Sequence, residues 1–187
     1  MRLFTGIDVP EEQKARLSEL LGKLRPHASL RWSRPGNLHI TTKFIGEWPE
    51  TRLDELRSAL AGVPARMPFS ISLSGLGWFP NPHNPRIFWV AVRGGEELAS
   101  LAADTERSAE AVGIAREDRA YTPHLTLARV PPAAPVGDLR RAVAALDSSD
   151  FGGWTPMEQA LYLSEPRADG SVYTVLARFP FEPDTTR

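Results

Sequence analysis

The first part of the chain alternates between strand-like and helix-like patterns of hydrophobic residues. Residues 3–9 are mostly apolar and predict a strand, and Pro10 stands where a proline can open a helix. Apolar residues then recur with the i, i+3, i+4, i+7 spacing of a buried helix face, at Leu17, Leu20, Leu21 and Leu24. Residues 38–45 are the next apolar run and predict a second strand.

A second helix, a third strand and a break follow. Thr51, with Asp54 three residues later, predicts the capped start of the helix. Its apolar face contains Leu53, Leu56 and Leu60. In residues 69–74 apolar residues alternate with serines, which predicts a strand with one solvated face. Residues 79–85 contain three prolines and two asparagines and predict a loop.

The same order of elements then starts again. Residues 87–92 predict a strand, and a helix with one apolar face follows and ends near Gly113. That face contains Leu98, Leu101, Ala102, Thr105, Ala109 and Val112. The remaining predicted elements are a strand at 123–130, a helix near 139–146, and a hairpin of residues 157–164 and 171–179 that turns near Asp169 and Gly170.

The two halves carry the same short motif at equivalent places. His39-Ile40-Thr41 and His124-Leu125-Thr126 each lie on the strand after the first helix of their half. Leu3 precedes the first histidine by 36 residues, and Ile87 precedes the second by 37. This repeat predicts an α+β fold of two duplicated lobes, each with an antiparallel sheet and helices, related by a pseudo-two-fold axis around a central cleft.

Length and composition indicate one soluble globular domain. The 187 residues are 42% hydrophobic and 24% charged, and we expect a single bilobal domain over residues 1–187. Lobe one is expected at about 1–80 and lobe two at about 86–180, in an arrangement that allows strands or segments to be exchanged between them. There is no cysteine, no apolar leader at the N-terminus and no run long enough to span a membrane, so we expect a cytoplasmic protein. A net charge of −1 argues against binding along extended duplexes but permits a small pocket for one phosphate or one RNA end.

The His-x-Thr pairs suit acid–base chemistry on a phosphate ester. Residues two apart share one face of a strand, so each motif presents an imidazole beside a hydroxyl. The imidazole donates or accepts a proton near neutral pH, and the hydroxyl binds an anionic oxygen. A zinc site is less well supported, because each motif supplies one good ligand where zinc uses three or four. No Gly-x-Ser-x-Gly elbow or nucleotide-binding Gly-x-x-x-x-Gly-Lys loop is present.

The sequence leaves undecided whether two basic residues near the motifs bind phosphate or are surface charges. Arg129 lies five residues after His124, so strict alternation places it on the opposite face, and it reaches a phosphate only if the strand ends or bulges first. The residues alone leave phosphate binding and a surface charge equally open. Lys43 shares the parity of His39, which allows a positive charge at the site, although a solvated lysine at the sheet end is the simpler interpretation.

Other histidines and aromatic residues are weaker candidates. His27 and His83 are interpreted as ordinary surface or capping residues. Five aromatic residues have the type needed to stack on a base, although most aromatics at such spacings belong to the core. They are Trp32, Phe44, Trp89, Tyr121 and Tyr162.

Residues 38–46 and 122–129, taken together, resemble the two-histidine (2H) phosphoesterase superfamily, and in particular its RNA 2′,3′-cyclic phosphodiesterase family, the LigT-like "2′-5′ RNA ligases". The resemblance covers nearly the whole chain and includes Arg31-Trp32 and the segments 2–4, 86–90 and 161–164. Thr42 departs from the family, in which leucine is frequent there; by parity it points away from the site.

The resemblance implies a bilobal enzyme that hydrolyses a terminal 2′,3′-cyclic phosphate to a 2′-phosphomonoester without a metal or other cofactor. It implies His39 and His124 as catalytic residues and Thr41, Thr126 and Arg129 as phosphate-binding residues. We assign His39 as proton donor and His124 as proton acceptor, although the pseudo-symmetry leaves the reverse nearly as good. The expected substrates are RNA ends or nucleotides with a 2′,3′-cyclic phosphate, tRNA fragments among them, acted on by a monomer that does not bind membranes.

Two alternatives stay open at this point. The first is reversible 2′-5′ RNA ligation, for example of tRNA halves, which is the same chemistry in the opposite direction. The second is a non-catalytic module that binds nucleotides or RNA ends. The presence of both histidines argues against pure binding, because binding requires neither of them to titrate.

Overall fold

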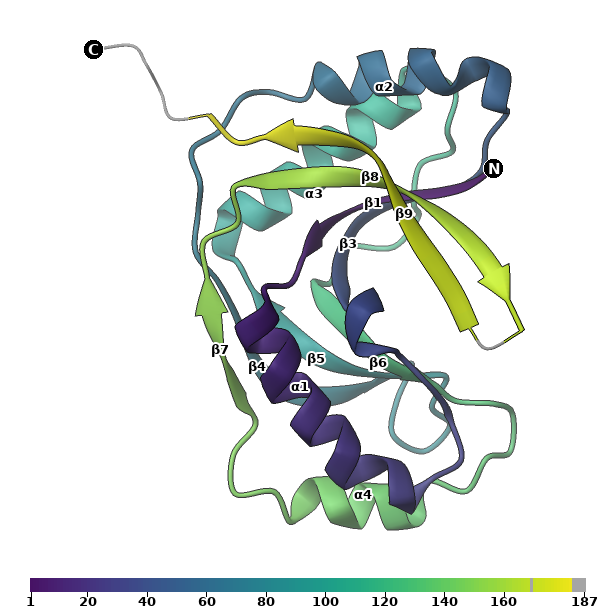
Figure 1. Cartoon of the computed structure of the whole chain (residues 1–187), viewed down its shortest axis with the longest axis vertical. Coiled ribbons are helices and arrows are strands. Elements are labelled where there is room, and N and C mark those ends of the chain that lie inside the picture. Colours follow the sequence, from purple (N-terminus) through teal and green to yellow (C-terminus); the bar gives the residue numbers. More distant parts are fainter. Residues whose placement is uncertain (169, 183–187) are drawn as a thin grey trace.

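A computed structural model describes residues 1–168 and 170–182 of the chain, in which two antiparallel sheets are covered by four α-helices (Figure 1). The four-stranded sheet has the order β3-β1-β8-β9, formed by β1 (Arg2–Asp8), β3 (His39–Glu47), β8 (Glu158–Arg167) and β9 (Gly170–Pro180). The five-stranded sheet has the order β2-β6-β5-β4-β7, formed by β2 (Arg31–Trp32), β4 (Ile71–Phe79), β5 (Ile87–Arg93), β6 (His124–Arg129) and β7 (Asp150–Trp154).

The helices divide between the two sheets. Helices α2 (Leu53–Ala61) and α3 (Gly95–Glu110) pack on each other beside the four-stranded sheet, while α1 (Glu11–Leu24) and α4 (Gly137–Ala144) lie beside the five-stranded sheet (Figure 1). In the described part of the chain, three short 3-10 helices connect these elements: η1 (Arg25–His27), η2 (Pro35–Asn37) and η3 (Glu50–Arg52).

Each sheet contains strands from both halves of the chain. The expected boundary between lobes, near residues 80–86, falls between β4 and β5, which pair with each other in the five-stranded sheet. The first helix of each half is exchanged as well. Helix α1 follows β1 but packs against β7, whereas α3 follows β5 but packs against β3. The bilobal architecture is confirmed, with each lobe assembled from both halves.

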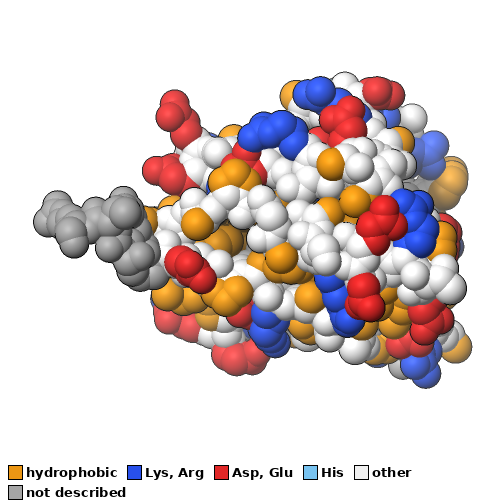
Figure 2. All heavy atoms as spheres, turned by 90° about the horizontal axis from the view of Figure 1, so that it is seen from above, with side chains coloured by type: hydrophobic (Ala, Val, Ile, Leu, Met, Phe, Trp, Pro, Cys, Tyr) orange, Lys and Arg blue, Asp and Glu red, His pale blue; other side chains and the backbone are white. Residues whose placement is uncertain are grey.

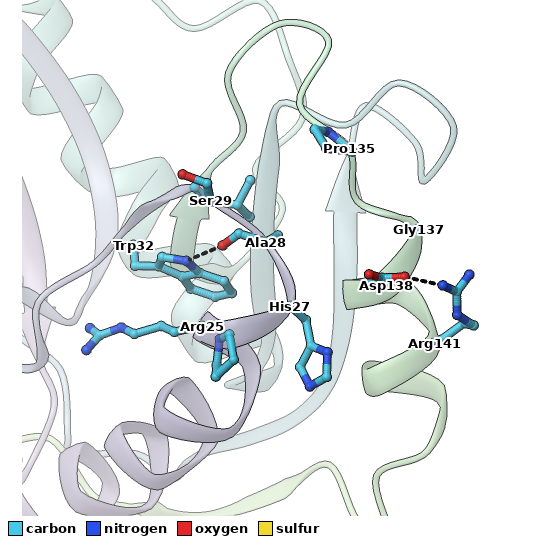
Figure 3. A pocket seen from close by; sticks show the side chains of 11 residues that line it. Arg25, His27, Ala28, Ser29, Trp32, Pro135, Gly137, Asp138 and Arg141 are labelled. Atoms are coloured by element: carbon cyan, nitrogen blue, oxygen red, sulfur yellow. Dashed lines mark hydrogen bonds and ion pairs between the residues drawn. The ribbon is translucent and has the colours of Figure 1, made fainter.

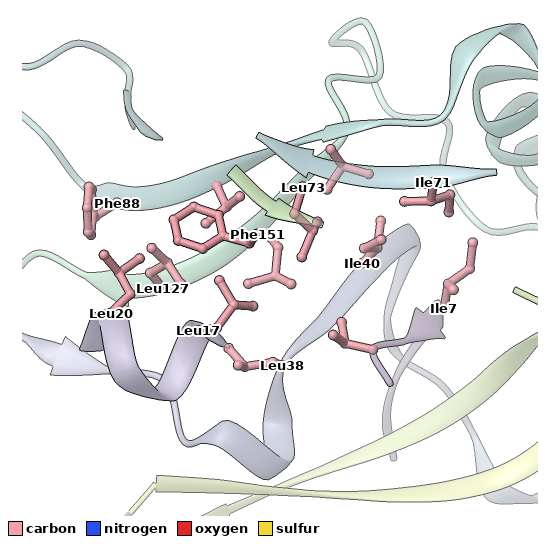
Figure 4. Packing of buried hydrophobic residues seen from close by; sticks show 14 of the residues in the cluster. Ile7, Leu17, Leu20, Leu38, Ile40, Ile71, Leu73, Phe88, Leu127 and Phe151 are labelled. Atoms are coloured by element: carbon pink, nitrogen blue, oxygen red, sulfur yellow. The ribbon is translucent and has the colours of Figure 1, made fainter. Parts of the chain in front are cut away.

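One hydrophobic cluster joins the two sheets. Ile7 and Ile40 from the four-stranded sheet are in the same buried cluster as Ile71 and Leu73 from β4, together with the apolar face of α1 (Figure 4). These four side chains are at most 1% exposed. A shared, close-packed core resists relative movement of its parts, so the strands that carry the two His-x-Thr motifs are held in a fixed relation.

Most predicted elements are present, with three differences. The expected Thr51 cap does not form, because a 3-10 turn contains Thr51 and the N-cap of α2 is Arg52, without a side-chain cap. Strand β4 begins later than predicted and extends to Phe79, which the Pro-rich pattern placed in a loop. Strands β2 and β7 were not predicted. The hairpin of β8 and β9 is confirmed, but Asp169 of its expected turn lies outside the described residues.

Charged groups are dispersed over the face of the molecule that carries α2 (Figure 2). Seen from the α2 side of Figure 1, acidic and basic side chains are interspersed with hydrophobic ones (Figure 2). Within residues 1–168 and 170–182, no helix has the length and apolar character needed to cross a membrane.

Candidate active site

His39, the first residue of β3, is held by hydrogen bonds on both ring nitrogens. Its Nδ1 lies 2.7 Å from the carbonyl oxygen of Asn37, and its Nε2 lies 3.0 Å from Oγ1 of Thr41. A carbonyl can only accept, so Nδ1 carries the proton and the neutral ring presents Nε2 as an acceptor for the Thr41 hydroxyl. The motif therefore orients Nε2 and a hydroxyl toward the same point.

His124, the first residue of β6, repeats this arrangement in the other sheet. Its Nδ1 lies 2.8 Å from the carbonyl oxygen of Thr122, again two residues earlier. The same argument leaves Nε2 of His124 free for proton transfer. Strands β3 and β6 contact each other although they belong to different sheets. The structure thus brings both predicted histidines together, each with a matching tautomer.

A β-bulge in each strand changes which later residues face the site. On β3, Thr41 pairs with Gly6 and Lys43 with Thr5, so Thr42 is an extra residue. On β6, Thr126 pairs with Trp89 and Ala128 with Phe88, so Leu127 is the extra residue. An extra residue reverses the alternation of side chains beyond it. The burial pattern of the first six residues, with two consecutive buried residues after each threonine motif, is the same in both strands.

The bulge at Leu127 returns Arg129 to the face of His124 and Thr126. Leu127 and Ala128 are both fully buried, while Arg129 is exposed. The positive charge of Arg129 lowers the pKa of His124 and of His39 and acts on Tyr173, so it lies within electrostatic reach of all three. Strand β6 therefore bulges before Arg129, as this residue requires in order to reach a phosphate bound at the two motifs.

The corresponding bulge at Thr42 overturns the expectation for Lys43. Strict parity allowed this lysine to face the site, or to be solvated at the sheet end, and both interpretations are wrong. Its side chain is 4% exposed, with Nζ 2.6 Å from Glu106 Oε1 and 2.8 Å from the Ala115 carbonyl. Thr42 points away from the site as predicted, and its hydroxyl bonds with Thr5 and Gln159 inside the core.

Phe44 takes the position on β3 that Arg129 has on β6. Each lies three residues after the threonine of its motif and beyond the bulge. The Phe44 side chain is 54% exposed, although it is large and apolar. The two equivalent positions therefore offer different chemistry, a cation on the five-stranded sheet and an aromatic ring on the four-stranded sheet.

Further aromatic rings surround the histidines. Next to His39 are Phe4, with ring centroids 4.6 Å apart, and Tyr173, at 5.1 Å edge-on. Phe79 meets His124 edge-on at 5.1 Å and packs against the Trp89 ring. Sequence reasoning missed Phe4, Phe79 and Tyr173, because only the register of neighbouring strands shows that they adjoin the motifs.

The other aromatic candidates have mixed outcomes. Tyr162 stacks on Phe4 at 5.0 Å, and burial raises its pKa to about 12. Trp32 is partly buried and packs edge-on against the buried Phe88 at the side of the core. The Tyr121 hydroxyl donates to the Thr41 carbonyl at 2.9 Å, and burial raises its pKa. Tyr121 therefore ties the segment before the second motif directly to the first.

The environment lowers the pKa of both catalytic candidates. Burial, which disfavours the charged imidazolium, is the main cause for His39 and for His124, and Arg129 adds to it. For His39, the hydrogen bond to Asn37 and the charge of Asp8 oppose this effect. Asp8 is the direct cross-strand partner of His39, a relation that the sequence pattern did not reveal. No described carboxylate has the same effect on His124.

Two surface pockets lie elsewhere and contain neither motif. One is formed between η1 and the start of α4 and is lined by His27, Trp32 and Asp138, among others (Figure 3). The second lies between α1 and the α4–β7 connection. His83 is exposed in the Pro-rich loop, where its backbone N–H donates to Asn81. Among the described residues, no group of three or more metal-ligating side chains is placed to hold a metal ion.

Comparison with known proteins identifies relatives over the full fold. The family model described as "LigT like Phosphoesterase" matches residues 7–89 and 90–156, and each segment contains one motif. The chain is 33% identical to the RNA 2′,3′-cyclic phosphodiesterase of Archaeoglobus fulgidus over 96% of this chain and 99% of that protein. It is 38% identical to the Thermus thermophilus protein of the same name, over 96% and 89% of the two chains.

Solved structures show the same similarity. The crystal structure of TT0787 from Thermus thermophilus matches with a TM-score of 0.80 at 34% identity, over 97% of this chain and 98% of that one. E. coli LigT complexed with 3′-AMP matches with a TM-score of 0.76 at 26% identity, again over 97% and 98%. With two equivalent His-x-Thr motifs on one fold, the chain belongs to the LigT-like phosphoesterase family.

Proposed function

We propose that this protein hydrolyses the terminal 2′,3′-cyclic phosphate of RNA to a 2′-phosphomonoester by two-histidine acid–base catalysis without a metal ion. One observation carries the proposal: two imidazoles at equivalent positions, each held through Nδ1 by a carbonyl and leaving Nε2 for proton transfer. Relatives at 33% and 38% identity are named RNA 2′,3′-cyclic phosphodiesterases, which supports the choice of substrate.

The reaction needs one proton removed and one supplied. His124 Nε2 takes a proton from water as the water oxygen attacks phosphorus. The bond between phosphorus and O3′ breaks, and O3′ receives a proton from His39 Nε2, which leaves a 3′-hydroxyl and a 2′-phosphate. Each assisted proton transfer is worth about 10²- to 10⁴-fold in rate. The Thr41 and Thr126 hydroxyls and the Arg129 guanidinium bind the charged phosphate oxygens.

The surroundings of the two histidines favour this assignment of roles. The proton donor must start as imidazolium, and a nearby carboxylate stabilises that form. The charge of Asp8 raises the pKa of His39 in this way. At His124, only the hydrogen bond to the Thr122 carbonyl opposes the lowering of the pKa. The Asp8 charge, which has no counterpart at His124 among the described residues, supports His39 as proton donor and His124 as proton acceptor.

The test is product analysis on a short RNA that ends in a 2′,3′-cyclic phosphate, in the presence of EDTA. We expect a 2′-phosphate product from the wild-type protein and a loss of at least about 100-fold in kcat in His39→Ala and in His124→Ala. His27→Ala, which removes a histidine that lines the distant pocket, is the matched control and should keep wild-type activity. Wild-type turnover in either motif variant, or activity restored only by added zinc, would contradict the mechanism.

Two further assays, on tRNA halves and on cyclic phosphate binding, separate the alternatives. A new 2′-5′ linkage between tRNA halves would show ligation, and tight binding of a cyclic phosphate without turnover would show a binding module. As part of the proposal, the protein acts in the cytoplasm as a monomeric single domain. Gel filtration of the active fraction tests whether the active protein is a monomer.

A further inference from the structure

Strand β2 gives the five-stranded sheet a feature that the other sheet lacks. On the four-stranded sheet, the motif strand β3 is the edge strand, whereas on the five-stranded sheet the motif strand β6 is covered by β2. Strand β2 has two residues, Arg31 and Trp32. The indole of Trp32 faces the core, where its ring meets Phe88 and its Nε1 donates to the Ala28 carbonyl (Figure 3). Arg31, the preceding residue, therefore faces the opposite side.

That side is the one on which Arg129 lies. Arg31 and Arg129 are direct cross-strand partners in the pairing of β2 with β6. Directly opposite residues project from the same face, with Cβ atoms about 5 Å apart. Both side chains are exposed, and within the described part of the chain neither guanidinium has an ion-pair partner. Like charges in this relation repel each other, and an anion bound between them relieves the repulsion.

An RNA end carries its next negative charge one nucleotide from the terminal phosphate. With the cyclic phosphate at Arg129, a second phosphate at that distance lies within reach of an arginine on the adjacent strand. The guanidinium fork suits phosphate oxygens, which it binds bidentately. A free 2′,3′-cyclic mononucleotide has no such second phosphate, so Arg31 has a partner only in a longer or 5′-phosphorylated substrate.

We propose that Arg31 binds the phosphate immediately 5′ of the terminal nucleotide and makes RNA ends, rather than free cyclic mononucleotides, the preferred substrates. The inference rests on the proposed function, because it takes the cyclic phosphate to lie at the two histidines. It assigns substrate selection to one guanidinium. A broad basic surface is not needed, in agreement with a net charge of −1.

The experiment compares two substrates that differ only in that phosphate, a 2′,3′-cyclic mononucleotide with and without a 5′-phosphate. The quantity measured is the ratio of their kcat/KM values, in which any effect common to both substrates cancels. We expect the wild-type protein to favour the 5′-phosphorylated substrate by about 10-fold or more, the value of a charged hydrogen bond. The ratio should fall close to one in Arg31→Ala and be intermediate in Arg31→Lys, which keeps the charge without the fork.

Arg93→Ala is the matched control, because Arg93 is an exposed arginine at the far end of β5, paired with Ser72. It should leave the ratio unchanged. Equal kcat/KM for the two substrates in the wild-type protein, or a full preference retained in Arg31→Ala, would overturn the inference while leaving the hydrolase intact. A preference lost in Arg2→Ala but not in Arg31→Ala would also overturn it, since Arg2 lies near Tyr173 on the other sheet. Failure to hydrolyse either substrate would instead count against the proposed function.

Discussion

The Lys43→Met substitution tests whether the bulge at Thr42 gives Lys43 a structural role. Methionine keeps much of the apolar stem but removes the charge that lies 2.6 Å from Glu106 Oε1. It also leaves the Ala115 carbonyl without its donor. The side chains of the pair are 4% and 18% exposed, so water replaces the lost partner poorly. Breaking a buried pair by removing one member costs about 3–5 kcal/mol.

The expected loss lies at the lower end of that range. Glu106 keeps a hydrogen bond from the Glu117 backbone N–H at 3.0 Å, which continues to stabilise the carboxylate. We therefore expect the free energy of unfolding to fall by about 3 kcal/mol. For a chain of this length, the melting temperature should drop by roughly 6–12 °C. The double variant Lys43→Met/Glu106→Leu removes both charges and should recover most of the loss.

Urea denaturation and catalytic assays at a temperature well below the transition distinguish the two roles. Because Nζ points toward α3, kcat/KM for the cyclic phosphate should remain within a few-fold of the wild-type value. A Lys43→Met protein as stable as the wild type would refute the buried-pair argument. A stable but inactive variant would show that Lys43 acts on the substrate, as strict alternation allowed.

Three further predictions concern the groups around the motifs. Because the folded protein lowers the pKa of His39 and His124 below the ordinary value of 6.5, the unfolded chain binds more protons, so the free energy of unfolding should fall as pH drops from about 7.5 to about 5.5. Urea denaturation across that range measures this slope, which should be shallower in His124→Gln; a stability that rises on acidification would contradict it. Asp8→Asn should shift the basic limb of the kcat/KM profile to lower pH if His39 is the proton donor, and a shift of the acidic limb would reverse the assignment. Tyr121→Phe removes the hydrogen bond to the Thr41 carbonyl and should cost about 1–2 kcal/mol in urea denaturation, and an unchanged midpoint would show that this bond is not needed.

The sequence predicts local elements and motif residues well, because each depends on nearby residues. Alternation marks β3 and β6, and their His-x-Thr pairs lie on one face as the two-residue period requires. Where alternation assigns a residue to the wrong face, the pairing with the neighbouring strand is the cause. The bulges at Thr42 and Leu127 arise from pairing with β1 and β5, and they move Lys43 into the core and Arg129 to the site.

The two strands that sequence reasoning missed have little local signal. Strand β2 is only two residues long, and β7 contains two adjacent glycines, which favour other conformations. Both form through pairing with distant strands, β6 and β4. The sequence pattern does not indicate Asp8 for the same reason, since only the register of β1 against β3 places it opposite His39.

The pairing of β1 with β8 determines when a complete site can exist during synthesis. Leu3 pairs with Leu163, so β1 completes its sheet only after β8, which lies far later in the sequence, has been synthesised and has left the ribosome. Contacts so far apart in sequence form late and slow the folding reaction. Helix α1 must likewise wait for β7 before its apolar face is covered. A nascent chain that already contains both histidines therefore lacks the supports that align them, and premature termination yields no fragment with a working pair.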